Sequence, residues 1–311
     1  MTEEARELTI PQDLAGERLD RALARMLPEY SRVRLQEWIR AGFVSLDGRP
    51  MRPRDLVSGG ESVVLRPQET LAVVSEPEAI SLEVVFEDAE LLVVDKPAGL
   101  VVHPGAGNPR GTLMNGLLHR HPPLAELPRA GIVHRLDKET SGLLLVAKTL
   151  QSHTALVRLM SERAISRHYE AICTGVLTGG GTIDAPIGRH PVDRLKMSVR
   201  RSGKPAVTHY RVLRRFAAHT YISVKLESGR THQIRVHLAH RGHPLLGDPV
   251  YGGRLAIPAG ASDTLQQALR NFRRQALHAA RLELTYREMP MKFEAPLPPD
   301  FQELLAALAG Q

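Results

Sequence analysis

The sequence predicts an α+β protein with a small N-terminal unit of helices and strands and a larger β-rich part. A length of 311 residues is sufficient for about two domains. Two apolar patterns with helical spacing near the N-terminus precede short strand-like runs, and further runs of this kind recur between turn residues along the rest of the chain. Hydrophobic residues make up 42% and charged residues 24%, as in globular proteins, which excludes collagen-like and low-complexity chains.

The small unit is expected over residues 18–66. Apolar positions over residues 19–27 predict a first helix, which Pro28 ends because proline cannot continue the backbone hydrogen bonding. A second helix is predicted over residues 31–41, from a serine N-cap to a glycine that follows it. Strands are expected at 43–46, before the hairpin signal Asp47-Gly48, and at 62–65. An N-terminal arm, 1–17, would precede this unit.

The larger part is expected over residues 81–311, after a linker at 67–80 that is rich in Pro and Glu. A helix is predicted over 152–163. Short apolar or alternating runs bounded by turn residues predict strands at 84–86, 91–94, 143–146, 209–213, 221–226 and 282–286.

The basic excess of the chain lies in the larger part. The chain has 41 basic and 34 acidic residues, a formal charge of +7, and arginine outnumbers lysine by 34 to 7. Residues 1–70 contain 11 basic and 12 acidic side chains, whereas the rest contains 30 and 22. Guanidinium groups suit phosphate, so this bias favours a nucleic-acid partner, although GC-rich coding would also raise the arginine content.

Cysteine content and the N-terminal residues predict a cytoplasmic protein. The single Cys173 can form neither an internal disulfide nor a cysteine-based zinc site, which suits a reducing compartment. The first 20 residues have no signal-peptide core, and the longest apolar run, 142–147, is far shorter than the ~20 residues that cross a bilayer.

The segment 131–143, GIVHRLDKETSGL, places Asp137 between two apolar runs. Spacing alone favours a turn-capping carboxylate there over a reactive group displayed on a loop.

The string HRLDKETSG at 134–142 resembles the signature of the RluA family of pseudouridine synthases. Further strings that resemble family motifs follow in order: RHYEA at 167–171, SGRTHQIRVH at 228–237, HPLLGDPVYG at 243–252 and RQALHA at 274–279. The small unit is similar to an S4 RNA-binding domain. Together these resemblances imply an S4 domain followed by a catalytic domain with a mixed, mostly antiparallel β-sheet flanked by helices.

The resemblance implies an isomerase that converts uridine in RNA to pseudouridine without a cofactor or a metal. Asp137 would act on the flipped uridine, Arg235 would pair with this aspartate, and Tyr169 would lie against the target base. Arg135 would enter the space that the flipped nucleotide leaves. Alternative interpretations are a half-buried strand tyrosine for Tyr169 and a phosphate contact in an alternating strand for Arg235.

Two basic regions are candidate RNA-binding surfaces. Between residues 189 and 215, nine basic side chains face a single acidic residue, which favours a loop that binds the RNA backbone over a merely solvated surface. The candidate RNA-binding residues are Arg21, Arg32, Arg34 and Arg40 in the small unit, and Arg135, Arg189, Arg194, Lys196, Arg200, Arg201 and Arg230 in the larger part.

Two other functions compete with the isomerase. His237, His240 and His243 suggest a metal-dependent hydrolase, but neither HExxH nor cysteine ligands accompany them. A non-catalytic RNA-binding or ribosome-assembly protein would not need Asp137, Tyr169 and Arg235 together. The family members that this chain resembles most imply large-subunit ribosomal RNA as the partner and its helix 69 stem-loop as the target.

Overall fold

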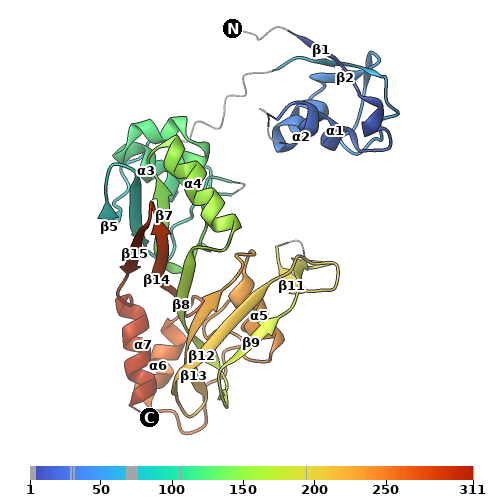
Figure 1. The fold of residues 1–311 in the computed structure, drawn as a ribbon. Coiled ribbons are helices and arrows are strands. Elements are labelled where there is room, and N and C mark those ends of the chain that lie inside the picture. The colour runs from blue at the N-terminus through green and yellow to red at the C-terminus, as the bar shows by residue number, and fades with distance from the viewer. Residues whose placement is uncertain are drawn as a thin grey trace. The chain divides into compact units, whose positions relative to one another are not determined.

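The structure, a computed structural model, describes residues 5–28, 30, 32–67, 76–105, 107–193 and 195–310, without the side chains of residues 33 and 34. The chain divides into two compact units, Met1–Val74 and Ser75–Gln311, which are described separately (Figure 1). The predicted α+β class is confirmed, with a mixed, mostly antiparallel sheet in the second unit. No helix among the described residues is long and apolar enough to span a membrane.

The first unit is a four-stranded antiparallel sheet, in the order β1-β4-β2-β3, with two α-helices. Buried side chains of the helices, such as Leu23 and Trp38, pack with strand residues such as Val63. The expected N-terminal arm is wrong for residues 6–9, because they form β1 and pair with β4. The elements are β1 (Arg6–Thr9), η1 (Gln12–Leu14), α1 (Leu19–Met26), α2 (Arg32–Arg40), β2 (Val44–Leu46), β3 (Arg49–Pro50) and β4 (Ser62–Leu65).

A buried ion pair joins the two α-helices of this unit. Asp20 in α1 is fully buried and accepts hydrogen bonds from Arg18, at 2.9 Å, and from Arg32 in α2, at 2.8 Å. Burial acts to raise the pKa of Asp20, but the bonds from Arg32, Arg18 and Gln36 outweigh it and lower the pKa. Because a buried carboxylate needs such partners, Arg32 contributes to the fold of this unit.

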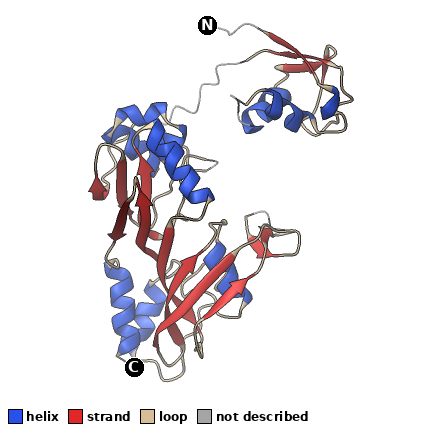
Figure 2. Ribbon diagram, in the orientation of Figure 1, coloured by secondary structure: helices blue, strands red, loops and turns tan. Residues whose placement is uncertain are grey.

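The second unit is built on a nine-stranded sheet in the described part of the chain, in the order β5-β6-β7-β14-β8-β13-β12-β9, with β15 paired to β14 (Figure 2). The pair β7–β14 is parallel and the others are antiparallel. Its strands are β5 (Glu83–Glu87), β6 (Leu91–Lys96), β7 (Ser141–Ala147), β8 (Ser166–Thr174), β9 (Gly181–Asp184), β12 (Val207–Arg215), β13 (His219–Leu226), β14 (Leu277–Tyr286) and β15 (Met289–Glu294).

Helices and a separate two-stranded sheet, β10–β11, complete this unit. The α-helices are α3 (Leu113–Arg120), α4 (Leu150–Ser161), α5 (Gln233–His240), α6 (Asp263–Asn271) and α7 (Pro299–Ala309), the short helices are η2 (Pro122–Glu126) and η3 (Pro128–Gly131), and the two strands are β10 (Ile187–Arg189) and β11 (Met197–Val199).

Strand β7 is buried along its whole length, which explains its continuous apolar sequence. On one face Leu144 packs in a cluster with Leu117 of α3, and on the other Leu145 packs with Leu156 of α4. The strand therefore holds the segment that precedes it, which contains Asp137, against the centre of the sheet.

Two predictions about local structure need correction. The basic segment that begins at Arg189 is not a loop, because β10 and β11 form an antiparallel hairpin and residues 207–215 belong to β12. Arg235 lies on helix α5 and not on an alternating strand. In the expected linker, residues 68–75 lie outside the described residues, whereas Glu76 accepts a 2.8 Å hydrogen bond from Asn115 of α3 through its carbonyl oxygen.

The parallel pair β7–β14 depends on Gly142, which lies opposite Ala279 at φ +112°. A β-carbon at this position would lie 2.4 Å from the Ala279 carbonyl oxygen. We expect Gly142→Ala to lower the free energy of unfolding by about 3 kcal/mol or more, through backbone strain and steric overlap. In the control Gly242→Ala, at φ +79° with no atom within 4 Å of the added carbon, strain alone should cost about 1–2 kcal/mol. Urea unfolding measures both, and equal losses would contradict the role of close packing.

Candidate active site

The loop that carries Asp137 is fixed to β7 and β14 through its own side chains. His134 accepts a hydrogen bond from the Leu145 amide at 3.0 Å. Thr140 accepts one from Gln275 at 3.0 Å, and Ser141 contacts His278 at 2.9 Å. The motif residues around Asp137 thus position the loop.

Lys96, at the end of β6, holds the same loop from another side. Its side chain is fully buried, and Nζ donates to the carbonyl oxygens of Pro97, Leu100 and Lys138 at 2.7, 2.9 and 3.0 Å. Burial lowers the pKa of Lys96 to about 8. These bonds fix the backbone directly after Asp137.

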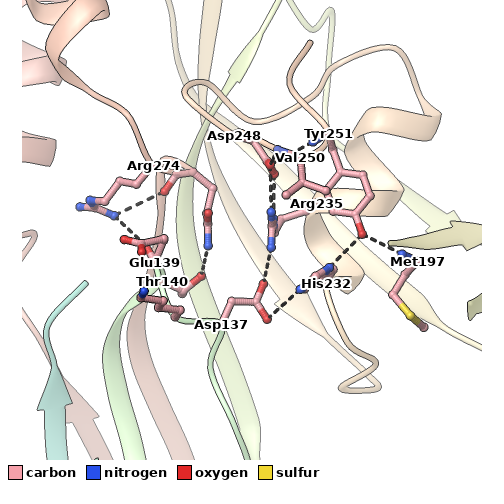
Figure 3. Close-up of polar contacts among 12 residues, drawn as sticks. Asp137, Glu139, Thr140, Met197, His232, Arg235, Asp248, Val250, Tyr251 and Arg274 are labelled. Atoms are coloured by element: carbon pink, nitrogen blue, oxygen red, sulfur yellow. Dashed lines mark hydrogen bonds and ion pairs between the residues drawn. The ribbon is translucent and has the colours of Figure 1, made fainter. Parts of the chain in front are cut away.

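Arg235 of α5 joins two carboxylates (Figure 3). Its Nη1 donates to Asp137 Oδ2 at 3.0 Å, while Nε and Nη2 donate to the two oxygens of Asp248 at 2.7 and 2.9 Å. Amides of Val250 and Tyr251 also donate to Asp248, at 2.9 and 3.0 Å. The pairing of Arg235 with Asp137 places the two predicted residues together.

Charge pairing in this group outweighs the cost of burial. Arg235 is 4% exposed and Asp248 3% exposed. Burial alone would lower the pKa of Arg235 and raise that of Asp248, but their mutual hydrogen bonds and attraction reverse both shifts. The guanidinium therefore stays charged beside Asp137, whose own side chain is partly accessible.

Tyr169 lies on β8, opposite Val224 of β13, and is buried in the main core of the second unit. Burial raises the pKa of its phenol, Arg167 opposes this effect, and the negative charge of Asp137 adds to it. Tyr169 is thus electrostatically coupled to Asp137. Arg135 is exposed two residues before Asp137 on the same loop.

Three residues of this site did not stand out in the sequence: Asp248, His232 and Tyr251. His232 lies 3.8 Å from Asp137 and, on its other side, 2.8 Å from the Tyr251 hydroxyl (Figure 3). All three fall within strings that resemble family motifs, yet spacing does not reveal a contact between residues 137 and 248. Asp137 and Asp248 come together because both bind Arg235 of helix α5.

Two of the three histidines suggested as metal ligands, His237 and His243, have other contacts. His237 contacts Thr208 at 2.8 Å and the Ala185 carbonyl oxygen at 2.9 Å, and His243 contacts the Thr174 carbonyl oxygen at 3.0 Å. Across the described ranges, no group of three or more His, Cys, Asp or Glu side chains is placed to hold a metal ion.

Most candidate RNA-binding residues of the second unit are on its surface. Arg189, Arg200, Arg201 and Arg230 are exposed, and Lys196 is half-buried beside Asp193, at 3.5 Å. Arg194 lies outside the described residues.

In the first unit the candidate RNA-binding arginines have protein partners. Arg21 lies 3.9 Å from Glu17, Arg32 binds Asp20, and Arg40 donates to Gln36 at 3.3 Å. The side chain of Arg34 is outside the described part.

Comparison with known proteins identifies the family. A family model described as RNA pseudouridylate synthase matches residues 90–240, and the S4 domain model matches residues 17–63. The chain is 57% identical to ribosomal large subunit pseudouridine synthase D of Pseudomonas aeruginosa, over 97% of this chain and 95% of that protein. The chain belongs to the RluA family of RNA pseudouridine synthases.

Other members of the pseudouridine synthase family agree with this assignment. The protein of the same name from Escherichia coli K12 is 50% identical, over 96% of this chain and 93% of its own. The solved structure of human RNA pseudouridylate synthase domain containing 4 has a TM-score of 0.58 at 27% identity and covers 73% of this chain and 93% of its own. The chain is thus an RNA pseudouridine synthase, and the predicted enzyme class is confirmed over the non-catalytic alternative.

The ion pair between Asp137 and Arg235 predicts the effect of Arg235→Met in this pseudouridine synthase. Methionine removes the cation between two carboxylates, so turnover should fall by about 100–1,000-fold, as expected when a group that holds a reacting charge leaves an active site. RNA binding, measured by filter retention, should stay within about tenfold because the surface arginines remain. Unaltered turnover would contradict the hypothesis that Arg235 pairs with Asp137 for catalysis.

Loss of stability is separable from this loss of turnover. Breaking a buried ion pair costs about 3–5 kcal/mol, so Arg235→Met should lower the unfolding temperature. The double variant with Asp248→Asn removes one unpaired charge and should recover part of the stability without recovering turnover.

Proposed function

We propose that this pseudouridine synthase isomerises uridines of large-subunit ribosomal RNA, in the helix 69 stem-loop, and that Asp137 is the carboxylate that acts on the flipped uridine. The observation that carries the proposal is the placement of Asp137. Its carboxylate is partly accessible on a braced loop, and a charge-assisted bond at 3.0 Å ties one oxygen to Arg235.

The chemistry needs an ionised carboxylate next to the target nucleotide. Isomerisation breaks the bond between N1 and C1′, joins C5 to C1′, removes the hydrogen from C5 and returns one to N1. No atom or electron is gained overall, so the reaction balances without an oxidant or a co-substrate. Asp137 attacks the nucleotide or abstracts a ribose proton, and in both cases it must be charged. Arg235 Nη1 donates to one oxygen of that carboxylate at 3.0 Å.

Tyr169 and Arg135 complete the proposed catalytic arrangement. Tyr169 is 6% exposed, and we propose that its ring lies against the flipped base once RNA is bound and that its phenol handles the C5 proton. Arg135 is exposed on the Asp137 loop, so its planar cation can occupy the position in the base stack that the flipped uridine leaves empty.

Large-subunit ribosomal RNA is the substrate that the relatives favour. The relatives at 50% and 57% identity are named ribosomal large subunit pseudouridine synthase D, and these alignments extend over nearly the whole chain. An S4 domain at the N-terminus supplies a second RNA contact. The assignment to helix 69 rests on the resemblance to synthase D.

The hairpin of β10 and β11 is the proposed RNA grip of the second unit. Arg200 braces it by donating to the Arg189 carbonyl oxygen at 2.9 Å. At its tip, Val192 and Leu195 are 85% and 88% exposed. Basic side chains next to exposed apolar ones suit contact with both phosphates and unpaired bases.

Tritium release tests the proposed function directly. An unmodified large-subunit transcript labelled at uridine C5 should release tritium with the intact protein in EDTA, because C5 loses its hydrogen when it bonds to C1′. Asp137→Ala should release none. Tight binding without release by the intact protein would contradict the substrate assignment, and labelled transfer RNA or messenger RNA would then be compared.

Neutralising the hairpin tests the proposed RNA grip. The triple variant Lys196→Gln/Arg200→Gln/Arg201→Gln should weaken binding and flatten the plot of log K against log salt by about 2–3, since each phosphate contact contributes about 0.7–0.9 to the slope. Fluorescence anisotropy at several salt concentrations gives the slope. The matched control, Arg158→Gln/Arg270→Gln/Arg273→Gln, removes the same charge elsewhere in the unit. An unchanged slope in the hairpin variant, or an equal change in the control, would contradict the grip.

A further inference from the structure

The two oxygens of Asp137 have different neighbours. Oδ2 accepts the hydrogen bond from Arg235, whereas Oδ1 lies 3.8 Å from Nε2 of His232. His232 is the N-cap of α5 and has a left-handed backbone, φ 56° and ψ 22°, which is uncommon for a residue with a side chain. This conformation places the imidazole between Asp137 and Tyr251 (Figure 3).

Contacts of Tyr251 and Asp137 bear on which nitrogen of His232 carries the proton. The Met197 amide donates to the Tyr251 hydroxyl oxygen at 2.9 Å, and this hydroxyl lies 2.8 Å from His232 Nδ1. The Asp137 carboxylate, 3.8 Å from Nε2, favours the tautomer with its proton on Nε2, and the Tyr251 O–H is free to donate to Nδ1. Nδ1 is then an acceptor, so the proton of the neutral ring is on Nε2 and faces Asp137.

Burial keeps this ring neutral. It lowers the pKa of His232, Asp137 and Asp248 act to raise it, and Arg235 and Arg135 add to the lowering. The net shift is downward, so the Nε2–H donor is retained at neutral pH.

We propose that His232 is a positioning residue for the reaction, which donates its Nε2–H to Oδ1 of Asp137 when RNA is bound, with Tyr251 selecting the required tautomer. The present separation of 3.8 Å is longer than a hydrogen bond. Catalytic hydrogen bonds often shorten only in the substrate complex, and a small side-chain rotation is sufficient here. Arg235 and His232 then fix one carboxylate oxygen each and set the plane of Asp137.

The same contacts connect the carboxylate to the RNA-binding hairpin. Met197 begins β11, and the ring of Tyr251 lies under the Arg235 guanidinium, 5.0 Å from ring centroid to Cζ. Tyr251 thus touches the hairpin, His232 and Arg235 together. If the hairpin moved on RNA binding, the Tyr251 hydroxyl, which contacts both Met197 and His232, would transmit the movement to His232.

Two substitutions at position 232 separate this role from a structural one. In His232→Gln the amide nitrogen occupies the place of Nε2, so a donor to Asp137 remains, whereas in His232→Asn it occupies the place of Nδ1. Asparagine tolerates the left-handed backbone better than glutamine does. A purely structural role therefore predicts that the Asn variant is the better enzyme, and the proposal predicts the opposite.

The measurements are single-turnover rate and RNA affinity, on a transcript that the wild-type protein modifies. We expect His232→Gln to stay within about fivefold of the wild-type rate and His232→Asn to lose about 30–100-fold, the size expected for a lost orienting hydrogen bond, with equal RNA affinity. A rate for the Asn variant equal to or above that of the Gln variant would overturn the proposal.

Tyr251→Phe provides a second test that does not depend on how the Gln variant folds. It keeps the ring under Arg235 but removes the hydroxyl that selects the tautomer, so the rate should fall by about tenfold at unchanged affinity. An unchanged rate would overturn the proposal.

The inference rests on Asp137 as the acting carboxylate, so Asp137→Asn is measured in parallel. Turnover retained in that variant would reject the proposed role of Asp137 and this inference together. A dead Asp137→Asn enzyme with fully active His232→Asn and Tyr251→Phe variants would reject this inference alone.

Discussion

The arrangement of the active site depends on one buried cation, the guanidinium of Arg235. It is 4% exposed and bridges Asp137 and Asp248. An arginine at this depth is stable only with charged partners, and a carboxylate such as Asp248 is stable there only with the arginine. Because three parts of the chain contribute one group each, the mutual need for neutralisation brings the β7 loop, α5 and the turn at residue 248 together.

Rigidity around Asp137 comes from hydrogen bonds to the loop and to the strands beside it. Lys96, His134, Thr140 and Ser141 satisfy backbone and side-chain groups on every side of the loop, which is attached to the fully buried strand β7. A reactive group on a loop is accurately positioned only when the loop is held in this way. The sheet thus fixes the position of Asp137, and the ion pair places the positive charge of Arg235 beside it.

Local patterns predicted part of the fold. The two N-terminal helices, the hairpin at Asp47-Gly48 and the helix at α4 follow from apolar spacing and caps, which act within a few residues. The hairpin at Arg189 was missed because its strands have three residues each and no alternating apolar pattern. Asp137, Tyr169 and Arg235 could be proposed through the family strings, whereas the contact of Arg235 with Asp248 depends on the tertiary fold and could not.

The parallel pairing of β7 with β14 has a consequence for the order in which this protein becomes active. Ser141 and His278, which contact each other beside the Asp137 loop, are 137 residues apart in the chain. A ribosome that has made the whole signature motif has therefore not yet made the strand that completes its support. Contacts of such long range form late in folding. A partly synthesised chain that lacks β14 would carry Asp137 without the geometry to use it, so RNA modification requires that β14 has been made.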